Sequence, residues 1–140
     1  GEFNHGYTYS GHPVCAAVAV ANIQLMQREN IVETVHDSTG PYLQKRIHEL
    51  GEHPLVGEVR GIGMLGAIEL VEDKAGYKKF HKDKGAGLTC RGHCFDNGLV
   101  MRAVGDTMIM SPPLIMQKSD IDTLIDRAWK SLDLTQKELL

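Results

Sequence analysis

The sequence has 140 residues, 42% of them hydrophobic, and its 15 basic and 18 acidic side chains give a formal charge of −3. A chain of this length buries roughly two thirds of its unfolded surface, which is enough for one compact domain. The charges are spread along the chain, so no basic patch predicts a nucleic-acid partner. The odd number of cysteines, the lack of a secretory leader and the lack of an apolar run near ~20 residues predict a cytoplasmic protein that is not inserted in a membrane.

The chain starts without an initiator methionine, and we expect it to be cut from a longer protein in which residues 1–10 form an interior loop. Pro13 predicts a helix start, because proline at the first helical position loses no hydrogen bond, and a serine or glycine before it can cap the helix. The following residues, 14–29, are alanine-rich and largely apolar. They predict a helix that is covered on most of its sides.

Residues 31–50 carry apolar side chains at helical spacing, but Gly40 and Pro41 interrupt them. This pattern predicts two short helices or one bent helix. Residues 55–71 contain β-branched and apolar residues punctuated by glycines, which predict two strands joined by a glycine bend. The charged residues 72–84 predict a solvated loop or a short helix.

Residues 85–97 predict an amphipathic helix that ends at Asn97 and Gly98. Two short strands, 99–103 and 107–110, flank Gly105-Asp106, which is a strong hairpin signal. The last helix is predicted from Ser119 as its cap, Asp122 as the partner in a capping box, and an apolar stripe that reaches Leu132. The order of elements predicts an α+β fold in which helices cover an antiparallel sheet.

Two motifs with possible chemistry are better explained by structure. Cys90, His93 and Cys94 lie within one helical turn, but a structural zinc site needs a second pair of ligands. We therefore predict no metal site and interpret the two cysteines as small buried hydrophobes. The glycines at 61, 63 and 66 have the spacing of a dinucleotide-binding loop, yet a strand follows them where that loop requires a helix. They predict a bend between strands.

Two other features are candidates for binding. The loop at residues 6–13 places hydroxyl groups and free backbone N–H groups just before a helix N-terminus, which suits a phosphate, although ordinary helix capping explains the same residues. Arg102 is a lone guanidinium in an apolar strand. It either faces water or faces a cleft, where its planar fork suits a carboxylate.

Four segments together resemble one family. They are HGYTYSGHPVCAAVAVAN at 5–22, GPYLQKRIHEL at 40–50, HPLVGEVRGIGMLGAIELV at 53–71 and NGLVMRAVGDTMIMSPPL at 97–114. The chain resembles the C-terminal portion of the class III pyridoxal-phosphate-dependent aminotransferases, particularly the omega-transaminases. The resemblance implies a fold type I enzyme. Residues 1–50 would form the C-terminal end of the large, cofactor-binding domain, and residues 51–140 the small C-terminal α+β domain.

The resemblance also implies a homodimer or higher homo-oligomer and a set of site residues. The loop that contains Tyr7 and Thr8 would reach across the dimer interface, where these two residues contact the phosphate of pyridoxal 5'-phosphate bound by the neighbouring subunit. Arg102 matches the mobile arginine that binds the carboxylate of the substrate. The implied reaction moves an amino group from an amine or amino acid donor to an α-keto acid, with pyruvate as the expected acceptor. Putrescine, β-alanine and arylalkylamines remain open as donors.

None of the lysines lies in a motif that matches the Schiff-base lysine of the family, so the resemblance places no catalytic residue in this chain. A cofactor enzyme needs that group to hold and tune its electron sink, and we expect the chain alone to be inactive. The alternative hypothesis is a non-catalytic α+β module that binds a ligand or dimerises.

Overall fold

The computed structural model describes residues 1–140, and its first half is helical. The helices in this half are α1 (Pro13–Arg28), α2 (Ile31–Thr34), the π-helical segment η1 (Val35–Thr39), α3 (Gly40–Glu49) and the 3-10 turn η2 (Leu50–Glu52). The second half contains β1 (Val56–Ile62), β2 (Leu65–Leu70), η3 (Lys82–Lys84), α4 (Ala86–Asp96), β3 (Arg102–Val104), β4 (Thr107–Met110) and α5 (Lys118–Leu139). The predicted α+β order of elements is confirmed.

The four strands form one sheet in the order β1-β2-β4-β3, and every neighbouring pair is antiparallel. Both predicted hairpins are present. Gly63 has a φ of +54° in the first turn and Gly105 a φ of +56° in the second, and this left-handed region favours glycine. The glycines of residues 61–66 therefore serve a bend between strands, as the sequence predicts.

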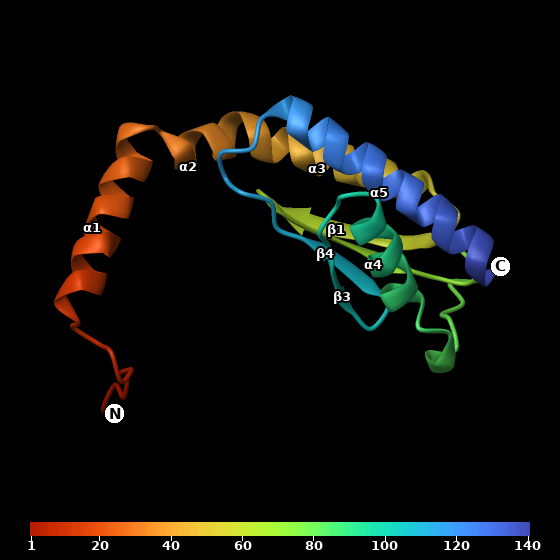
Figure 1. The fold of residues 1–140 in the computed structure, drawn as a ribbon, viewed down its shortest axis with the longest axis horizontal. Coiled ribbons are helices and arrows are strands. Elements are labelled where there is room, and N and C mark those ends of the chain that lie inside the picture. Colours follow the sequence, from red (N-terminus) through yellow and green to blue (C-terminus); the bar gives the residue numbers. More distant parts are fainter.

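The core lies between one face of the sheet and the helices α3, α4 and α5 (Figure 1). Ile68 of β2 and Met108 of β4 are almost completely buried under these helices. The helices contribute Leu43, Ile47, Cys90, Cys94, Ile121, Ile125 and Leu132 to the same cluster. Because α3 shares this core with the sheet, residues 40–50 pack with residues 51–140 in this structure. The division into a large domain at 1–50 and a small domain at 51–140 stays a prediction.

The interruption at Gly40 and Pro41 produces one bent helix, which is one of the two predicted outcomes. The Gly40 N–H donates to the oxygen of Val35, five residues back, so the ladder passes through a π-helical turn. A Cβ at position 40 would lie 2.5 Å from that oxygen. Glycine is therefore required at this close approach.

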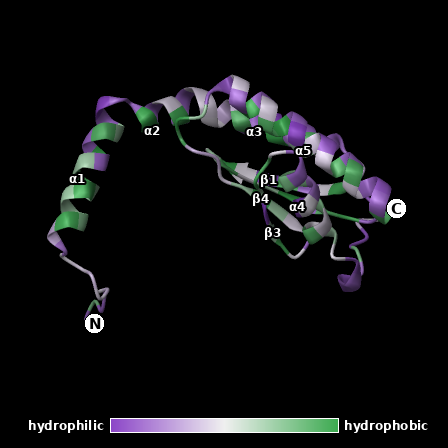
Figure 2. Cartoon of the chain, in the orientation of Figure 1, coloured by the Kyte–Doolittle hydropathy of each residue, from purple (hydrophilic) through white to green (hydrophobic).

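The first helix extends away from the rest of the molecule (Figure 1). No residue of α1 is buried, and Val14 and Val18 are each 64% exposed. Apolar residues lie along the whole helix, as Figure 2 shows. No residue of this chain covers the helix, so the expected covering on most of its sides stays a prediction about the complete protein. A helix that is apolar around most of its circumference is typical of a buried position in a larger body.

Two capping predictions are wrong, although both helices exist. Pro13 opens α1 as predicted, but the residue before the helix is His12, and no side chain caps it. The capping box of α5 uses Gln117 and Asp120, not Ser119 and Asp122. The helix thus begins one residue before Ser119. None of the helices combines the length and the hydrophobicity that a membrane-spanning segment requires.

Candidate functional site

The loop before α1 contains a tight turn from Tyr7 to Ser10. The Ser10 N–H donates to the Tyr7 oxygen at 2.9 Å, and the Tyr7 N–H donates to the Ser10 hydroxyl at 2.8 Å. Thr8 lies at the tip of this turn. The His12 N–H then donates to the Tyr9 oxygen at 3.1 Å, which connects the turn to the start of the helix.

The donors in this loop fit a phosphate group. The Thr8 hydroxyl and the N–H groups of Thr8 and Tyr9 have no acceptor within the chain. The helix that follows has no acidic residue in its first turn, and its free N–H groups give that end a partial positive charge. Hydroxyl and N–H donors beside a helix N-terminus are the groups that bind phosphate oxygens. The donor set is therefore suited to the phosphate of pyridoxal 5'-phosphate.

Arg102 lies on β3, which forms one edge of the sheet. Directly paired residues of antiparallel strands point to the same face, and the register pairs Arg102 with Ile109 and Ile109 with Ala67. These three side chains therefore lie on the face opposite to the helices, while Met108 points into the core. We call this the open face of the sheet. Arg102 is exposed there.

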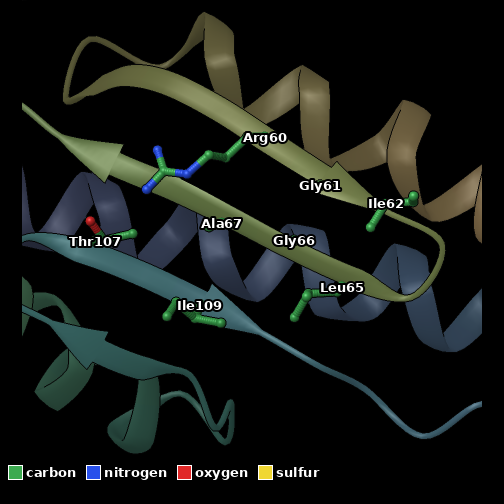
Figure 3. Close-up of a pocket in the computed structure, with 8 residues that line it drawn as sticks. All are labelled: Arg60, Gly61, Ile62, Leu65, Gly66, Ala67, Thr107 and Ile109. Atoms are coloured by element: carbon green, nitrogen blue, oxygen red, sulfur yellow. The ribbon is translucent and has the colours of Figure 1, made fainter. Parts of the chain in front are cut away.

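The open face is hollowed beside Arg102. Ile109, Ala67 and Leu65 contribute to a shallow apolar cavity of about 400 Å³, which Figure 3 shows on β1, β2 and β4. The complete lining consists of Arg60, Gly61, Ile62, Leu65, Gly66, Ala67, Thr107 and Ile109. Ile62 is 78% exposed and Leu65 is 49% exposed, so apolar surface remains uncovered at this site.

Arg60, the other arginine on this face, already has acidic partners. It lies 3.3 Å from Glu58 and 3.4 Å from Glu69. Glu69 also pairs with Lys79 at 2.7 Å, and the hydrogen bond from Lys79 lowers the pKa of Glu69 below its ordinary value. No acidic side chain pairs with Arg102. Arg102 is thus the guanidinium on the open face that is available to a carboxylate.

The chain does not bring the two candidate sites together. The turn with Tyr7 and Thr8 lies at the far end of α1, and Arg102 lies on the sheet at the other end of the molecule (Figure 1). Neither site has a lysine among the residues described above. This chain therefore presents two separate candidate binding features.

The cysteines of α4 behave as the sequence predicts. Cys90 and Cys94 are each 1% exposed and belong to the core cluster against α5. No group of three His, Cys, Asp or Glu side chains is arranged to hold a metal ion.

Sequence reasoning missed the apolar hollow and the role of Ser10 in the turn. A signal for the hollow exists in β4, where Met108, Ile109 and Met110 leave the strand apolar on both faces. A strand that is apolar at successive positions indicates that both of its faces are covered in the complete protein. For Ser10 the sequence indicates only a possible helix cap, because a hydroxyl before Pro13 has that role in many helices.

The fold corresponds to that of part of known transaminases. Residues 1–132 match the model of the family described as aminotransferase class-III. The chain is 59% identical over 140 residues to the putrescine--pyruvate aminotransferase of Pseudomonas aeruginosa, and the alignment covers 100% of this chain and 30% of that protein. The chain is 37% identical to gamma aminobutyrate transaminase 1, mitochondrial, of Solanum lycopersicum, in an alignment that covers 99% of this chain and 27% of that protein.

A crystal structure of the PMP-bound form of an aminotransferase from Vibrio fluvialis superposes with a TM-score of 0.89 at 34% identity, over 99% of this chain and 30% of that one. The architecture is therefore that of part of a fold type I transaminase. The chain belongs to the class III aminotransferases, a family that depends on pyridoxal phosphate. It spans about 30% of the length of its relative from Pseudomonas aeruginosa.

Proposed function

We propose that this chain is part of a pyridoxal-phosphate-dependent aminotransferase that transfers an amino group from an amine donor to pyruvate. The observation that carries the proposal is the 59% identity, over the whole chain, to a putrescine--pyruvate aminotransferase. The free donors of the turn at Tyr7 and Thr8 and the unpaired guanidinium of Arg102 support it, because they match a phosphate and a carboxylate in chemistry.

In this proposal, the turn binds the cofactor phosphate. The Thr8 hydroxyl and the N–H groups at the tip of the turn donate hydrogen bonds to phosphate oxygens, and Tyr7 lies beside them. When bound in the complete enzyme, the cofactor supplies the electron sink of the reaction, and the protein supplies binding and orientation. The resemblance to the family implies that the phosphate bound by this turn belongs to the site of a neighbouring subunit. A homodimer is therefore part of the proposal.

Arg102 binds the carboxylate of the keto acid. Its neighbours on the open face are apolar, so water around the ion pair is reduced when the substrate is bound, and the attraction is stronger than in bulk water. An uncharged amine donor makes no such pair. The exposed position of Arg102 on an edge strand leaves its long side chain free to move aside for that donor.

We propose pyruvate as the acceptor and a diamine such as putrescine as the first donor to test. The name of the relative from Pseudomonas aeruginosa supports this choice. The identity to the gamma aminobutyrate transaminase is lower, at 37%, and we rank its donor second. A cytoplasmic location stays a prediction from the sequence.

The test uses the complete protein from which the chain comes. The purified protein, incubated with pyridoxal phosphate, putrescine and pyruvate, is expected to form alanine, measured by chromatography against reactions without donor. Gamma-aminobutyrate and β-alanine serve as alternative donors in matched reactions. Absence of alanine with every donor would contradict the proposal and would favour the non-catalytic module.

A further inference from the structure

Ser10 makes two hydrogen bonds to one residue, and both close the same turn. Its N–H donates to the Tyr7 oxygen at 2.9 Å, and its hydroxyl accepts the Tyr7 N–H at 2.8 Å. The backbone polar groups of Tyr7 are thereby both satisfied by Ser10. The donors of Thr8 and Tyr9, between them, are left without acceptors in the chain.

Within this chain, little else holds the turn in place. Tyr7 is 75% exposed and Tyr9 is 78% exposed, and no residue from 1 to 12 is buried. Glycines lie on both sides of the turn, and Gly11 has a φ of +75°. Glycine gives the backbone many alternative conformations, so the ordered turn depends on its few local hydrogen bonds.

We propose that Ser10 is a positioning residue for the cofactor phosphate, which it holds indirectly by fixing the turn that presents Thr8. This inference rests on the proposed function of the turn. Because the Ser10 hydroxyl accepts the Tyr7 N–H, the turn is already formed before the ligand binds, and the donors of Thr8 and Tyr9 remain free for the phosphate. A preorganised turn loses less conformational entropy on binding, so the affinity for the phosphate rises without a direct contact from Ser10.

The experiment measures cofactor affinity in the complete protein without bound cofactor. Ser10→Ala removes the acceptor, and we expect pyridoxal phosphate to bind about three- to tenfold more weakly, as the net contribution of one hydrogen bond gives. The affinity for pyridoxal, which lacks the phosphate, should not change. Ser10→Thr keeps the hydroxyl and should restore most of the loss. Ser119→Ala is the matched control, because Ser119 is exposed and its hydroxyl makes no hydrogen bond in the chain.

A second measurement does not depend on any ligand. Hydrogen exchange of the Tyr7 amide should be faster in Ser10→Ala than in the parent protein and the Ser119→Ala control, because that amide loses its acceptor. If Ser10→Ala weakens pyridoxal and pyridoxal phosphate equally, or leaves both affinities unchanged, the positioning role is refuted. If Thr8→Ala also leaves the phosphate affinity unchanged, the proposed function of the turn fails as well, and the two failures are thus distinguished.

Discussion

His53, the residue directly after η2, forms a pair with Asp133 of α5, with the His53 Nε2 3.2 Å from the Asp133 Oδ1. The other ring nitrogen, Nδ1, accepts the Leu55 N–H at 3.1 Å. Since Nδ1 is an acceptor, the proton of the neutral ring is on Nε2 and is donated to Asp133. The ring is 1% exposed and packs edge-on against Trp129, with 5.1 Å between the ring centroids.

This environment predicts that the fold loses stability in acid. Burial lowers the pKa of His53 below its ordinary value of 6.5, and the pair with Asp133 opposes this only in part. Below pH 6.5 the unfolded chain therefore binds a proton that the folded chain does not, and the free energy of unfolding falls. The contribution is complete above about pH 6.5 and decreases as the pH falls through that value. Urea unfolding between pH 8 and pH 5 measures it.

Two variants separate His53 from the other titrating groups. His53→Gln should have a smaller loss of stability between pH 8 and pH 5 than the parent chain, because no ring must be protonated. His81→Gln is the control, since the side chain of His81 is 78% exposed. It should follow the parent profile. Equal slopes for all three proteins would mean that His53 does not cause the acid sensitivity.

The same substitution should lower the free energy of unfolding by different amounts on the two faces of the first hairpin. Ile68 of β2 is 1% exposed beneath the helices, whereas Ile62 of β1 is 78% exposed on the open face. Ile68→Ala should reduce the free energy of unfolding of the chain by about 2 to 5 kcal/mol, because it removes buried methyl groups and leaves a cavity. Ile62→Ala should change it by less than about 0.5 kcal/mol. Denaturant unfolding of both variants tests this, and similar costs would contradict the assigned faces.

The hairpins, the last three helices and the antiparallel sheet were predictable from sequence, because glycine turns and apolar spacing are local signals. The residues that cap the helices were not. Gln117, not Ser119, caps α5, because Asp120 can return a bond to the Gln117 N–H at 3.0 Å, and Asp122 is instead 3.0 Å from Arg46 of α3. A tertiary contact thus decides which of the two acidic residues takes part in the capping box of α5. Spacing alone cannot contain that information.

The candidate site divides in the same way. Tyr7, Thr8 and Arg102 came from residue types and from the family resemblance, and their roles stay predictions. Which face Arg102 occupies required the register with Ile109, because a shift of one residue would move the side chain to the other face. That Arg60 is already paired could be known only from its contacts with Glu58 and Glu69 in the structure, because Glu69 lies on another strand.

The exposed first helix predicts that the chain self-associates. Val18 is 64% exposed and Ile23 is 55% exposed on α1, and apolar surface of this extent favours association. Val18→Lys should raise the concentration for half-association by about tenfold or more, because burial of a valine contributes about 1.5 kcal/mol or more. Gln24→Lys adds the same charge at an exposed polar position and should have little effect. Sedimentation velocity over a range of concentrations makes the comparison. A parent chain that stays monomeric throughout would refute the prediction.

The last prediction concerns Arg102 in the complete protein. If its guanidinium pairs with the carboxylate of the keto acid in a partly desolvated site, Arg102→Ala should cost about 2 to 4 kcal/mol in kcat/KM for pyruvate, because a charge loses its partner. The half-reaction with an uncharged monoamine should change by less than about 1 kcal/mol, since Arg102 then makes no ion pair. Steady-state kinetics measure the first effect, and single-turnover absorbance of the cofactor measures the second.

The conservative variant and a control complete this test. Arg102→Lys should fall between the parent and alanine proteins, because lysine keeps the charge but lacks the planar fork that binds a carboxylate with two hydrogen bonds. Arg91→Ala, which removes an exposed arginine from α4 on the other side of the sheet, should leave both half-reactions unchanged. If Arg102→Ala slows both half-reactions equally, the guanidinium acts on the structure of the edge strand, since only a group that binds the carboxylate distinguishes the keto acid from the uncharged amine.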